Sequence, residues 1–195
     1  LNVSIKENQK IPEIIAVSKT FSLEKIIPLL DHGHKNFGEN KIQEALSKWS
    51  EIKNKYKDLK LHMLGKVQTN KVKFLIPLFD YLHSLDNLKL AEKISNEQIK
   101  KDKKIKIFIQ VNLGKEEQKS GITLENLENF YKECKINLNL DIIGLMCLPP
   151  KEDQPKKFFD KLKEYSIRYD LPELSMGMSN DFDIASRCGS TFIRV

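Results

Sequence analysis

Arginine is scarce in this 195-residue chain: of its 33 basic residues only Arg168, Arg187 and Arg194 are arginine. A net charge of +6 and a pI near 9.0 are compatible with a nucleic-acid-binding protein, because clustered cations attract phosphates. The planar donors of arginine, however, suit phosphates and base edges better than lysine does. The lysines are also intermixed with glutamate, which is typical of a solvated surface. We therefore expect no nucleic-acid partner.

Cysteine and long apolar runs are also scarce. Cys134, Cys147 and Cys188 are far apart and have no histidine at ligand spacing, so neither a disulfide framework nor a zinc site is expected. No apolar stretch approaches the ~20 residues of a membrane span, and the first residues, LNVSIKENQK, lack the apolar core of a secretory signal. The sequence thus predicts a cytoplasmic protein without a membrane partner, and we favour a monomer.

Short apolar runs alternate with longer helical patterns along the chain, without a low-complexity linker, which indicates a single domain over residues 1–195 built from βα units. The expected strands are 13–19, 34–39, 61–65, 80–86, 105–112, 142–148, 173–178 and 191–195. The expected helices are 22–32, 40–56, 68–79, 87–101, 123–135, 155–169 and 179–188.

Eight strands with helices between them predict an α/β fold, a TIM-type (β/α)8 barrel, in which strands buried on both faces are continuously apolar. An open doubly wound sheet is the alternative, since periodicity does not show closure. A glycine-rich nucleotide fingerprint would favour the open sheet, but neither GxGxxG nor GxxxxGK[ST] occurs. The sequence therefore favours the barrel.

The chain ends at Val195, within the eighth expected strand, and its 195 residues are fewer than the about 250 typical of such barrels. The helix that would cover this strand is missing, and so is most of a leading helix. An exposed strand edge would cost stability and favour aggregation. We therefore expect either a shortened chain or a departure from the usual barrel.

Lys19 ends the apolar run of the segment IIAVSKT, residues 14–20. In βα barrels the functional residues lie at the carboxyl ends of the strands. A lysine there either extends to water or lies in a low-dielectric mouth, where desolvation lowers the pKa of the amine. A neutral amine attacks aldehydes and ketones, so Lys19 is a candidate for a Schiff base with a sugar carbonyl or with pyridoxal phosphate. The alternative is an ordinary exposed lysine.

Two later segments also carry polar residues at expected strand ends. SMGMSND, residues 175–181, ends a strand and is expected to begin a helix at Ser179, whose free N–H groups and hydroxyl suit a phosphate; the alternative is an ordinary serine N-cap. Arg194 lies on the last strand, where an unpaired buried guanidinium would be costly. A pyridine nitrogen, a carboxylate or a phosphate would satisfy Arg194.

These segments, taken in order, resemble a known family. AVSKT, FGEN followed by IQEA, HMLGKVQTNK, HSLD, IQVNLGKEEQKSGI, GLM, LSMGMSND and GSTFIR run from residue 14 to the end of the chain. Together they resemble the pyridoxal phosphate homeostasis protein family, whose barrel is similar to the N-terminal domain of alanine racemase. Any one of these motifs alone would be weak, whereas their succession is specific.

The resemblance implies which residues bind the cofactor. Lys19 of AVSKT would carry pyridoxal 5'-phosphate as an aldimine, Ser179 would contact its phosphate, and Arg194 would face its pyridine nitrogen. The resemblance also suggests Asn40 as a residue lining the cofactor, with His62 and Met178 as weaker candidates. In the family a glycine segment after the arginine completes the phosphate site, and this sequence does not include it.

The residues also bear on whether the protein is a catalyst. Arginine is always protonated and does not accept a proton from the pyridine nitrogen, so the ring is a poorer electron sink than one paired with aspartate. Alanine racemase, which resembles this arrangement, uses a tyrosine base, and no tyrosine of this chain falls at an expected strand end. We therefore expect a pyridoxal phosphate carrier that could deliver the cofactor to apoenzymes, without robust catalysis. The alternatives are a racemase-type enzyme and a cofactor-free Schiff-base aldolase.

Overall fold

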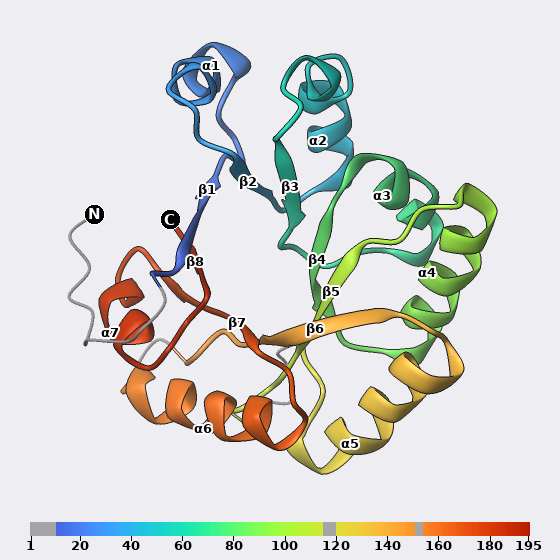
Figure 1. Cartoon of the computed structure of the whole chain (residues 1–195), viewed down its shortest axis with the longest axis vertical. Helices are drawn as coiled ribbons and strands as arrows, with labels where there is room; N and C mark the ends of the chain where they lie inside the picture. The colour runs from blue at the N-terminus through green and yellow to red at the C-terminus, as the bar shows by residue number, and fades with distance from the viewer. Residues whose placement is uncertain (1–10, 115–119, 151–153) are drawn as a thin grey trace.

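Eight parallel strands form a closed barrel whose order around the ring is the order along the chain (Figure 1). The computed structural model describes residues 11–114, 120–150 and 154–195. The strands are β1 (Glu13–Val17), β2 (Asn36–Glu39), β3 (Lys60–Met63), β4 (Tyr81–Leu85), β5 (Lys106–Gln110), β6 (Asp141–Met146), β7 (Glu173–Met178) and β8 (Phe192–Arg194). The fold class predicted from the sequence, a (β/α)8-type barrel, is confirmed.

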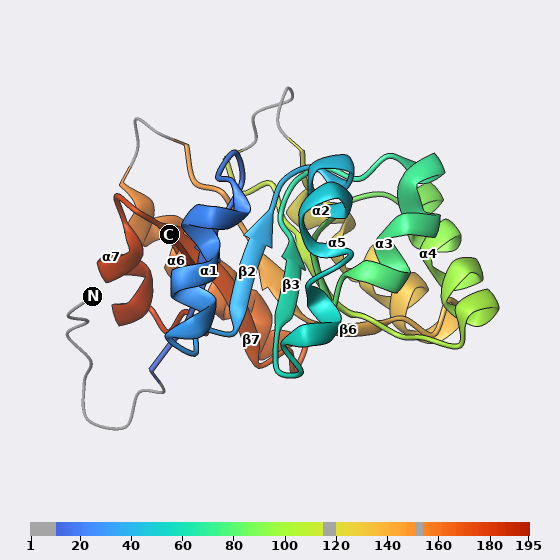
Figure 2. The ribbon, with the colours of Figure 1, turned by 90° about the horizontal axis from the view of Figure 1, so that it is seen from above.

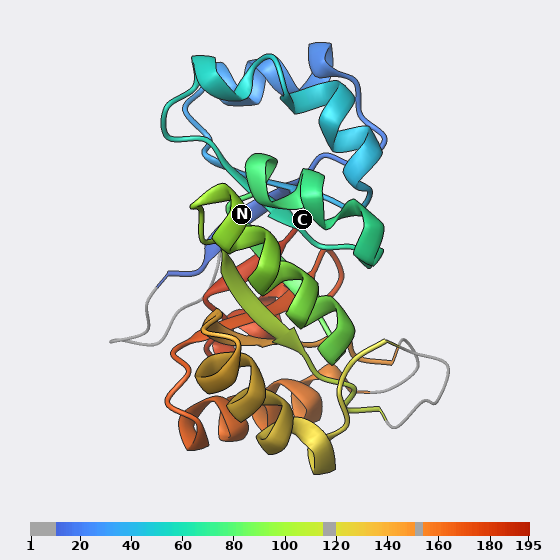
Figure 3. The same ribbon diagram turned by 90° about the vertical axis from the view of Figure 1, so that its right-hand side faces the viewer.

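The helices surround the barrel on its outer side, as Figures 1 and 3 show. They are α1 (Leu23–Asp31), α2 (Ile42–Trp49), α3 (Val72–Leu78), α4 (Leu88–Lys101), α5 (Leu124–Lys132), α6 (Pro155–Arg168) and α7 (Phe182–Arg187). Shorter turns are the 3₁₀ helices η1 (Lys53–Lys55) and η2 (Thr69–Lys71) and the π-helical turn η3 (Glu133–Asn137). No helix among the described residues has the length and apolar character needed to span a membrane.

Several expected helices are shorter than predicted, among them the second and the last. The helix predicted over 40–56 ends at Trp49, because the segment that follows is polar and buries no residue of η1. There Lys53 leaves the helix pattern and donates to Asp80, 2.9 Å away, next to the start of β4. The last helix begins at Phe182 and not at Ser179, because the Met178 N–H and the Asp181 side chain form a closed turn before it.

The exposed edge expected at the last strand is absent. Strand β8 pairs with β7 on one side and with β1 on the other, so both of its edges are hydrogen-bonded. Helix α7 packs against β8 as well as β7, and the expectation that a covering helix is missing stays a prediction. The predicted shortening of a leading helix concerns residues 1–10, which lie outside the described residues.

The barrel encloses a mixed interior. Its apolar part is a cluster of Ile15, Phe108, Met146 and Phe192. Two imidazoles share this space: the ring of His83 is stacked on Phe108 and that of His62 on Tyr81, each pair with ring centroids 4.3 Å apart. The larger apolar core lies between the strands and the helices. Burial on both faces explains the continuous apolar runs of the sequence.

Candidate functional site

The site is built where β1, β2 and β8 end side by side. The Val17 N–H donates to the Val195 carbonyl at 2.7 Å, and the Ser18 N–H donates to the Gly38 carbonyl at 2.9 Å. Lys19 therefore follows β1 at the same rim where Arg194 ends β8 and Asn40 follows β2. Figure 2 shows β2 and β3 side by side next to α1 and α2. The parallel order of the strands brings these residues, which are far apart in the sequence, to one mouth.

Lys19 has an exposed side chain. Of the two environments that the sequence left open, the structure thus shows water and not a low-dielectric mouth. The next residue, Thr20, has a left-handed backbone with φ of 66°, which ends the extended run and turns the chain toward α1. An exposed amine at the end of β1 is accessible to an aldehyde that arrives from solvent.

A buried ion pair holds the backbone on which Lys19 lies. The Glu39 carboxylate, fully buried, accepts at Oε1 from the Ser18 hydroxyl (2.8 Å), Lys48 Nζ (2.9 Å) and Trp49 Nε1 (2.9 Å). Lys48 Nζ also donates to the Ser18 carbonyl at 2.8 Å. The hydroxyl and the carbonyl of Ser18 are thus both bound by this cluster. The residue immediately before the candidate amine is thereby fixed.

The same cluster reaches the residue after Lys19. Glu44 accepts from Lys48 Nζ at 3.1 Å and from the Thr20 backbone N–H. The Thr20 N–H donation lowers the pKa of the Glu44 carboxyl from its ordinary value. We call the set Ser18, Glu39, Glu44, Lys48 and Trp49 the Glu39 cluster. Its residues clamp the chain on both sides of Lys19.

The sequence analysis did not identify the Glu39 cluster, although a signal for it was present. Glu39 lies in the FGEN motif on a strand whose neighbours are buried, and a buried carboxylate requires a cation. Glu44 and Lys48 are four residues apart on α2 and so share one helix face. A carboxylate on β2 followed by this pair on the next helix could have predicted the ion pair.

Asn40, predicted to line the cofactor, is half-buried and follows β2 at the mouth. Its position depends on Gly65, because a Cβ at Gly65 would lie 2.1 Å from the Asn40 carbonyl oxygen. Only glycine lets the segment after β3 come this close. The Ser84 hydroxyl donates to the Gly65 carbonyl at 2.7 Å and holds that segment in turn. Asn40 is therefore brought to the rim beside β1.

Met178 and Ser179 lie at the end of β7, and both are exposed. The strand register shifts between Ser175 and Met178, around Gly177, whose φ is +93°. This irregularity pairs Met178 with Arg194 of β8. The structure thus brings Met178 to the mouth beside Arg194. The helix expected to begin at Ser179 begins three residues later, so Ser179 lies in a turn and not at a helix N-terminus.

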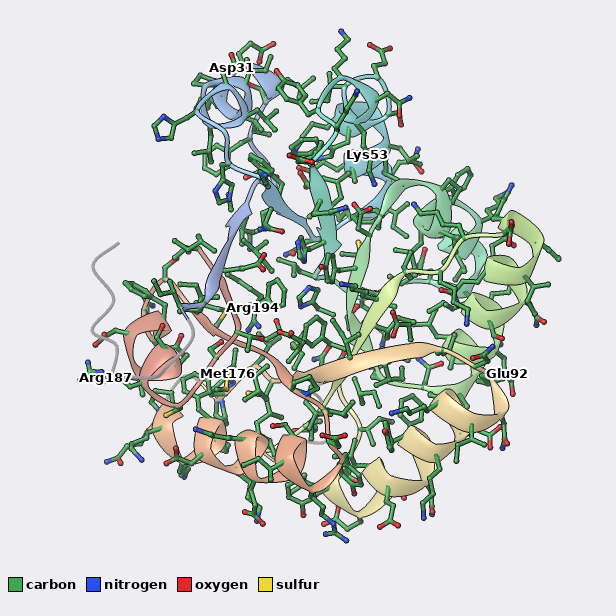
Figure 4. All side chains as sticks on the ribbon, in the orientation of Figure 1. Asp31, Lys53, Glu92, Met176, Arg187 and Arg194 are labelled. Atoms are coloured by element: carbon green, nitrogen blue, oxygen red, sulfur yellow. The ribbon has the colours of Figure 1, made fainter. Side chains whose placement is uncertain are left out.

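Arg194 is a buried cation, 5% exposed, that lies toward the middle of the ring of strands in Figure 4. Its Nη1 donates to the Ser175 hydroxyl at 2.8 Å and its Nη2 to the Cys147 carbonyl at 3.1 Å. Burial lowers the pKa of Arg194 from its ordinary value, yet arginine remains protonated in proteins. Two of its five N–H hydrogens have these acceptors, and no carboxylate among the described residues forms an ion pair with it. The guanidinium can therefore donate to a further acceptor at the mouth.

His62 is the predicted site residue that the structure does not bring to the mouth. It is fully buried inside the barrel, and its two ring nitrogens lie 3.0 Å from Asn36 Oδ1 and 3.0 Å from His83 Nε2. The ring of His62 stacks on Tyr81. Asn36 and Tyr81 are the first residues of β2 and β4, at the end of the barrel away from the mouth. With both nitrogens engaged there, His62 has no position from which to contact a ligand near Lys19.

The two buried histidines predict a pH dependence of stability. Burial lowers the pKa of His62 to about 3 and that of His83 well below its ordinary value. The unfolded chain, with a histidine pKa of about 6.5, therefore binds more protons than the folded chain, so the stability is complete above pH 6.5 and falls as the pH falls below it. We expect the free energy of unfolding in urea to be about 4 kcal/mol lower at pH 5 than at pH 7. The exposed His32→Gln variant should show the same loss as wild type, and a pH-independent stability would contradict the prediction.

Comparison with known proteins was made against family models and curated sequences. The family model described as alanine racemase, N-terminal domain, matches residues 3–193. The pyridoxal phosphate homeostasis protein of Aquifex aeolicus (strain VF5) is 37% identical over 194 residues, which cover 94% of this chain and 83% of the relative. That of Helicobacter pylori (strain ATCC 700392 / 26695) is 36% identical, over 95% of this chain and 85% of the relative. Both the family model and these relatives extend over nearly the whole chain.

Solved structures also match this chain over nearly its whole length. PipY of Synechococcus elongatus PCC7942, with PLP bound, has a TM-score of 0.87 and 31% identity, and the match covers 94% of this chain and 90% of PipY. The alanine racemase of Corynebacterium glutamicum has a TM-score of 0.71 at 16% identity and covers 94% of this chain and 53% of the racemase, which shows a shared fold alone. The chain belongs to the pyridoxal phosphate homeostasis protein family, whose barrel is that of the alanine racemase N-terminal domain.

Proposed function

We propose that this protein binds pyridoxal 5'-phosphate at the mouth of the barrel, with Lys19 as the residue that holds it covalently, and that it carries the cofactor without robust catalysis. The observation that supports this most is the position of Lys19 and Arg194 at one rim, on neighbouring strands. One offers an exposed amine and the other a buried guanidinium with free donor capacity. The names of the relatives and the PLP-bound PipY support the choice of cofactor.

The residues present fit this cofactor. Pyridoxal phosphate supplies an aldehyde, which joins a primary amine through a C=N bond with loss of water. The Glu39 cluster binds the backbone on both sides of Lys19 and would thereby position its amine for that bond. Arg194 would donate to the pyridine nitrogen, which is an acceptor without charge. Asn40 and Met178 would line the cofactor, and the Ser179 hydroxyl would donate to the phosphate.

The absence of a tyrosine at the mouth, within the described part of the chain, supports the carrier role. Arg194 only donates, so it takes no proton from the ring nitrogen. All five tyrosines lie among the described residues, and none is at the mouth. Tyr81 begins β4 and packs against His62, whereas Tyr56, Tyr131, Tyr165 and Tyr169 lie outside the barrel. This chain therefore supplies no phenolic base where a racemase would need one.

The carrier role implies how the protein acts in a cell. A reversible bond to Lys19 would keep the free aldehyde low and would let the cofactor pass to apoenzymes in transient encounters. We propose that residues 1–195 form one such binding domain that acts as a monomer in the cytoplasm. The three cysteines, all free and buried, are compatible with a reducing compartment.

The covalent attachment can be tested by spectroscopy. Protein saturated with pyridoxal phosphate and freed of excess cofactor should absorb near the visible edge, and borohydride should remove this band. Mass analysis of the reduced, digested protein should then place the added mass on the peptide that contains Lys19. Adduct on another lysine, or a colourless protein after saturation, would contradict the proposal.

Turnover separates the carrier from a racemase-type enzyme, which the family model of an alanine racemase domain keeps as the second candidate. We expect loaded protein in deuterated water to exchange the Cα hydrogen of L- and D-alanine no faster than free cofactor does. The measurement is the Cα proton signal over time in NMR spectra. Fast exchange that starts from both enantiomers would show racemase activity and overturn the carrier role.

A further inference from the structure

A row of polar side chains runs through the barrel interior from Arg194 to the opposite end of the barrel. Arg194 Nη1 is 2.8 Å from Ser175 Oγ, which is 2.7 Å from His83 Nδ1. His83 Nε2 is 3.0 Å from His62 Nδ1. The row crosses from β8 and β7 to β4 and β3, and Ser175 and both histidines are fully buried. Such a row is costly unless every donor has an acceptor.

The far end of the row reaches a carboxylate. His62 Nε2 is 3.0 Å from Asn36 Oδ1, and Asn36 Nδ2 donates to Glu13 Oε2 at 2.9 Å. A carboxylate only accepts, so the amide of Asn36 must direct its NH₂ group toward Glu13 and its oxygen toward His62. The oxygen requires a donor, which places the hydrogen of His62 on Nε2 and leaves His62 Nδ1 as an acceptor. His83 must then donate from Nε2.

The cationic end gives the same direction independently. Arginine only donates, so the Ser175 oxygen is an acceptor toward Arg194. The hydroxyl hydrogen of Ser175, which is fully buried, has His83 Nδ1 as its acceptor, and no other bond of this hydroxyl is found among the described residues. His83 Nδ1 is therefore an acceptor, and its hydrogen lies on Nε2. Both ends thus assign the same tautomer to the same ring.

We propose that Ser175, His83 and His62 are positioning residues that form, with Asn36 and Glu13, a one-directional hydrogen-bond chain which fixes the Arg194 guanidinium at the mouth as a donor to the cofactor's ring nitrogen. The role toward the ring nitrogen rests on the proposed function. The chain explains why three polar side chains fill the space that apolar residues fill elsewhere in the barrel. It also explains why a positive charge is stable at the mouth without an adjacent carboxylate. In every hydrogen bond of the chain the group nearer to Arg194 donates and the group farther from it accepts, so the guanidinium faces an acceptor.

The tautomers provide a test that does not depend on the cofactor. In ¹⁵N NMR spectra of histidine-labelled apoprotein, the rings of His62 and His83 should each show a protonated Nε2 and an unprotonated Nδ1. His62→Gln and His83→Gln variants assign the two signals. Protonation at Nδ1 of either ring, or a ring that exchanges between tautomers, would break the direction of the chain and overturn the proposal.

The effect on Arg194 can be measured as a binding preference. The probes are pyridoxal 5'-phosphate and its 1-deaza analogue, in which a C–H group replaces the ring nitrogen. We expect wild type to bind pyridoxal phosphate about tenfold more tightly, because a hydrogen bond from a charged donor is lost with the analogue. Ser175→Ala should lower this preference to within about threefold while it changes affinity for the analogue little. A merely structural loss would weaken both probes equally.

The control variant is Ser186→Ala, a buried serine on α7 whose hydroxyl bonds the Phe182 carbonyl of its own helix. It should keep the preference of wild type. An unchanged preference in folded Ser175→Ala would overturn the proposal and leave the carrier function intact. If neither probe binds wild type, the proposed function fails, and the link to the ring nitrogen fails with it. The NMR result alone then decides on the direction of the hydrogen-bond chain. If Ser175→Ala does not fold, the tautomers of wild type likewise decide.

Discussion

Replacing Lys19 with alanine should abolish the covalent binding of pyridoxal phosphate. The variant removes the exposed amine that follows β1, where the Glu39 cluster binds the backbone on both sides. The absorption band near the visible edge and the adduct formed by borohydride reduction should both be absent. The remaining contacts of Arg194 and Ser179 are non-covalent, so gel filtration should remove the cofactor from the variant. Wild type should retain the cofactor through the same step. Absorbance of the filtered protein is the measurement.

The matched control is Lys41→Ala. Lys41 is also exposed and follows Asn40 at the same rim, so the two variants remove equal charge from the same region. Lys41→Ala should retain the cofactor through gel filtration as wild type does. Equal loss in both variants would indicate a general effect of positive charge at the rim, and retention by Lys19→Ala would show that another residue holds the aldehyde.

The order of the elements could be predicted because burial on both faces makes barrel strands apolar throughout. Each of the eight expected strands overlaps an observed one. The boundaries were less predictable where side chains leave the helix pattern for a distant partner. Lys53 does so toward Asp80, and Asp181 closes a turn on Met178 before α7 begins. Such contacts join segments that periodicity treats separately.

The site was predictable only in part. The placement of Lys19 and Arg194 at one rim could be predicted because each is a charge at the end of an apolar strand, and their role toward a cofactor stays a prediction. His62 was placed by its motif, and the structure shows that its side chain faces the barrel interior at the end away from the mouth. The partners of His62, which are Asn36 and His83, lie on other strands, so the strand alternation alone did not show which end of the barrel the ring occupies.

Replacing Lys48 with methionine should lower the free energy of unfolding by about 3–5 kcal/mol, because it leaves the Glu39 carboxylate buried without its cation. Glu39 is fully buried and Lys48 is 7% exposed, so water does not replace the lost partner. The cost is increased by Glu39 Oε2, which has no hydrogen-bond partner among the residues that the structure describes. Methionine keeps the apolar stem of lysine, so the change isolates the charge. Urea unfolding at pH 7 measures the loss.

Two further variants show that the loss comes from an unpaired charge. Lys35→Met breaks an exposed pair, Lys35 with Asp58 at 3.0 Å, and should cost less than about 1 kcal/mol. Adding Glu39→Gln to Lys48→Met removes both charges, so the double variant should be more stable than Lys48→Met alone. A Lys48→Met cost no larger than that of Lys35→Met would mean that the pair does not hold the chain at Ser18. The same cluster binds both sides of Lys19, so the Lys48→Met variant should also bind pyridoxal phosphate more weakly, and the stability of the barrel and the position of its candidate amine would depend on one buried ion pair.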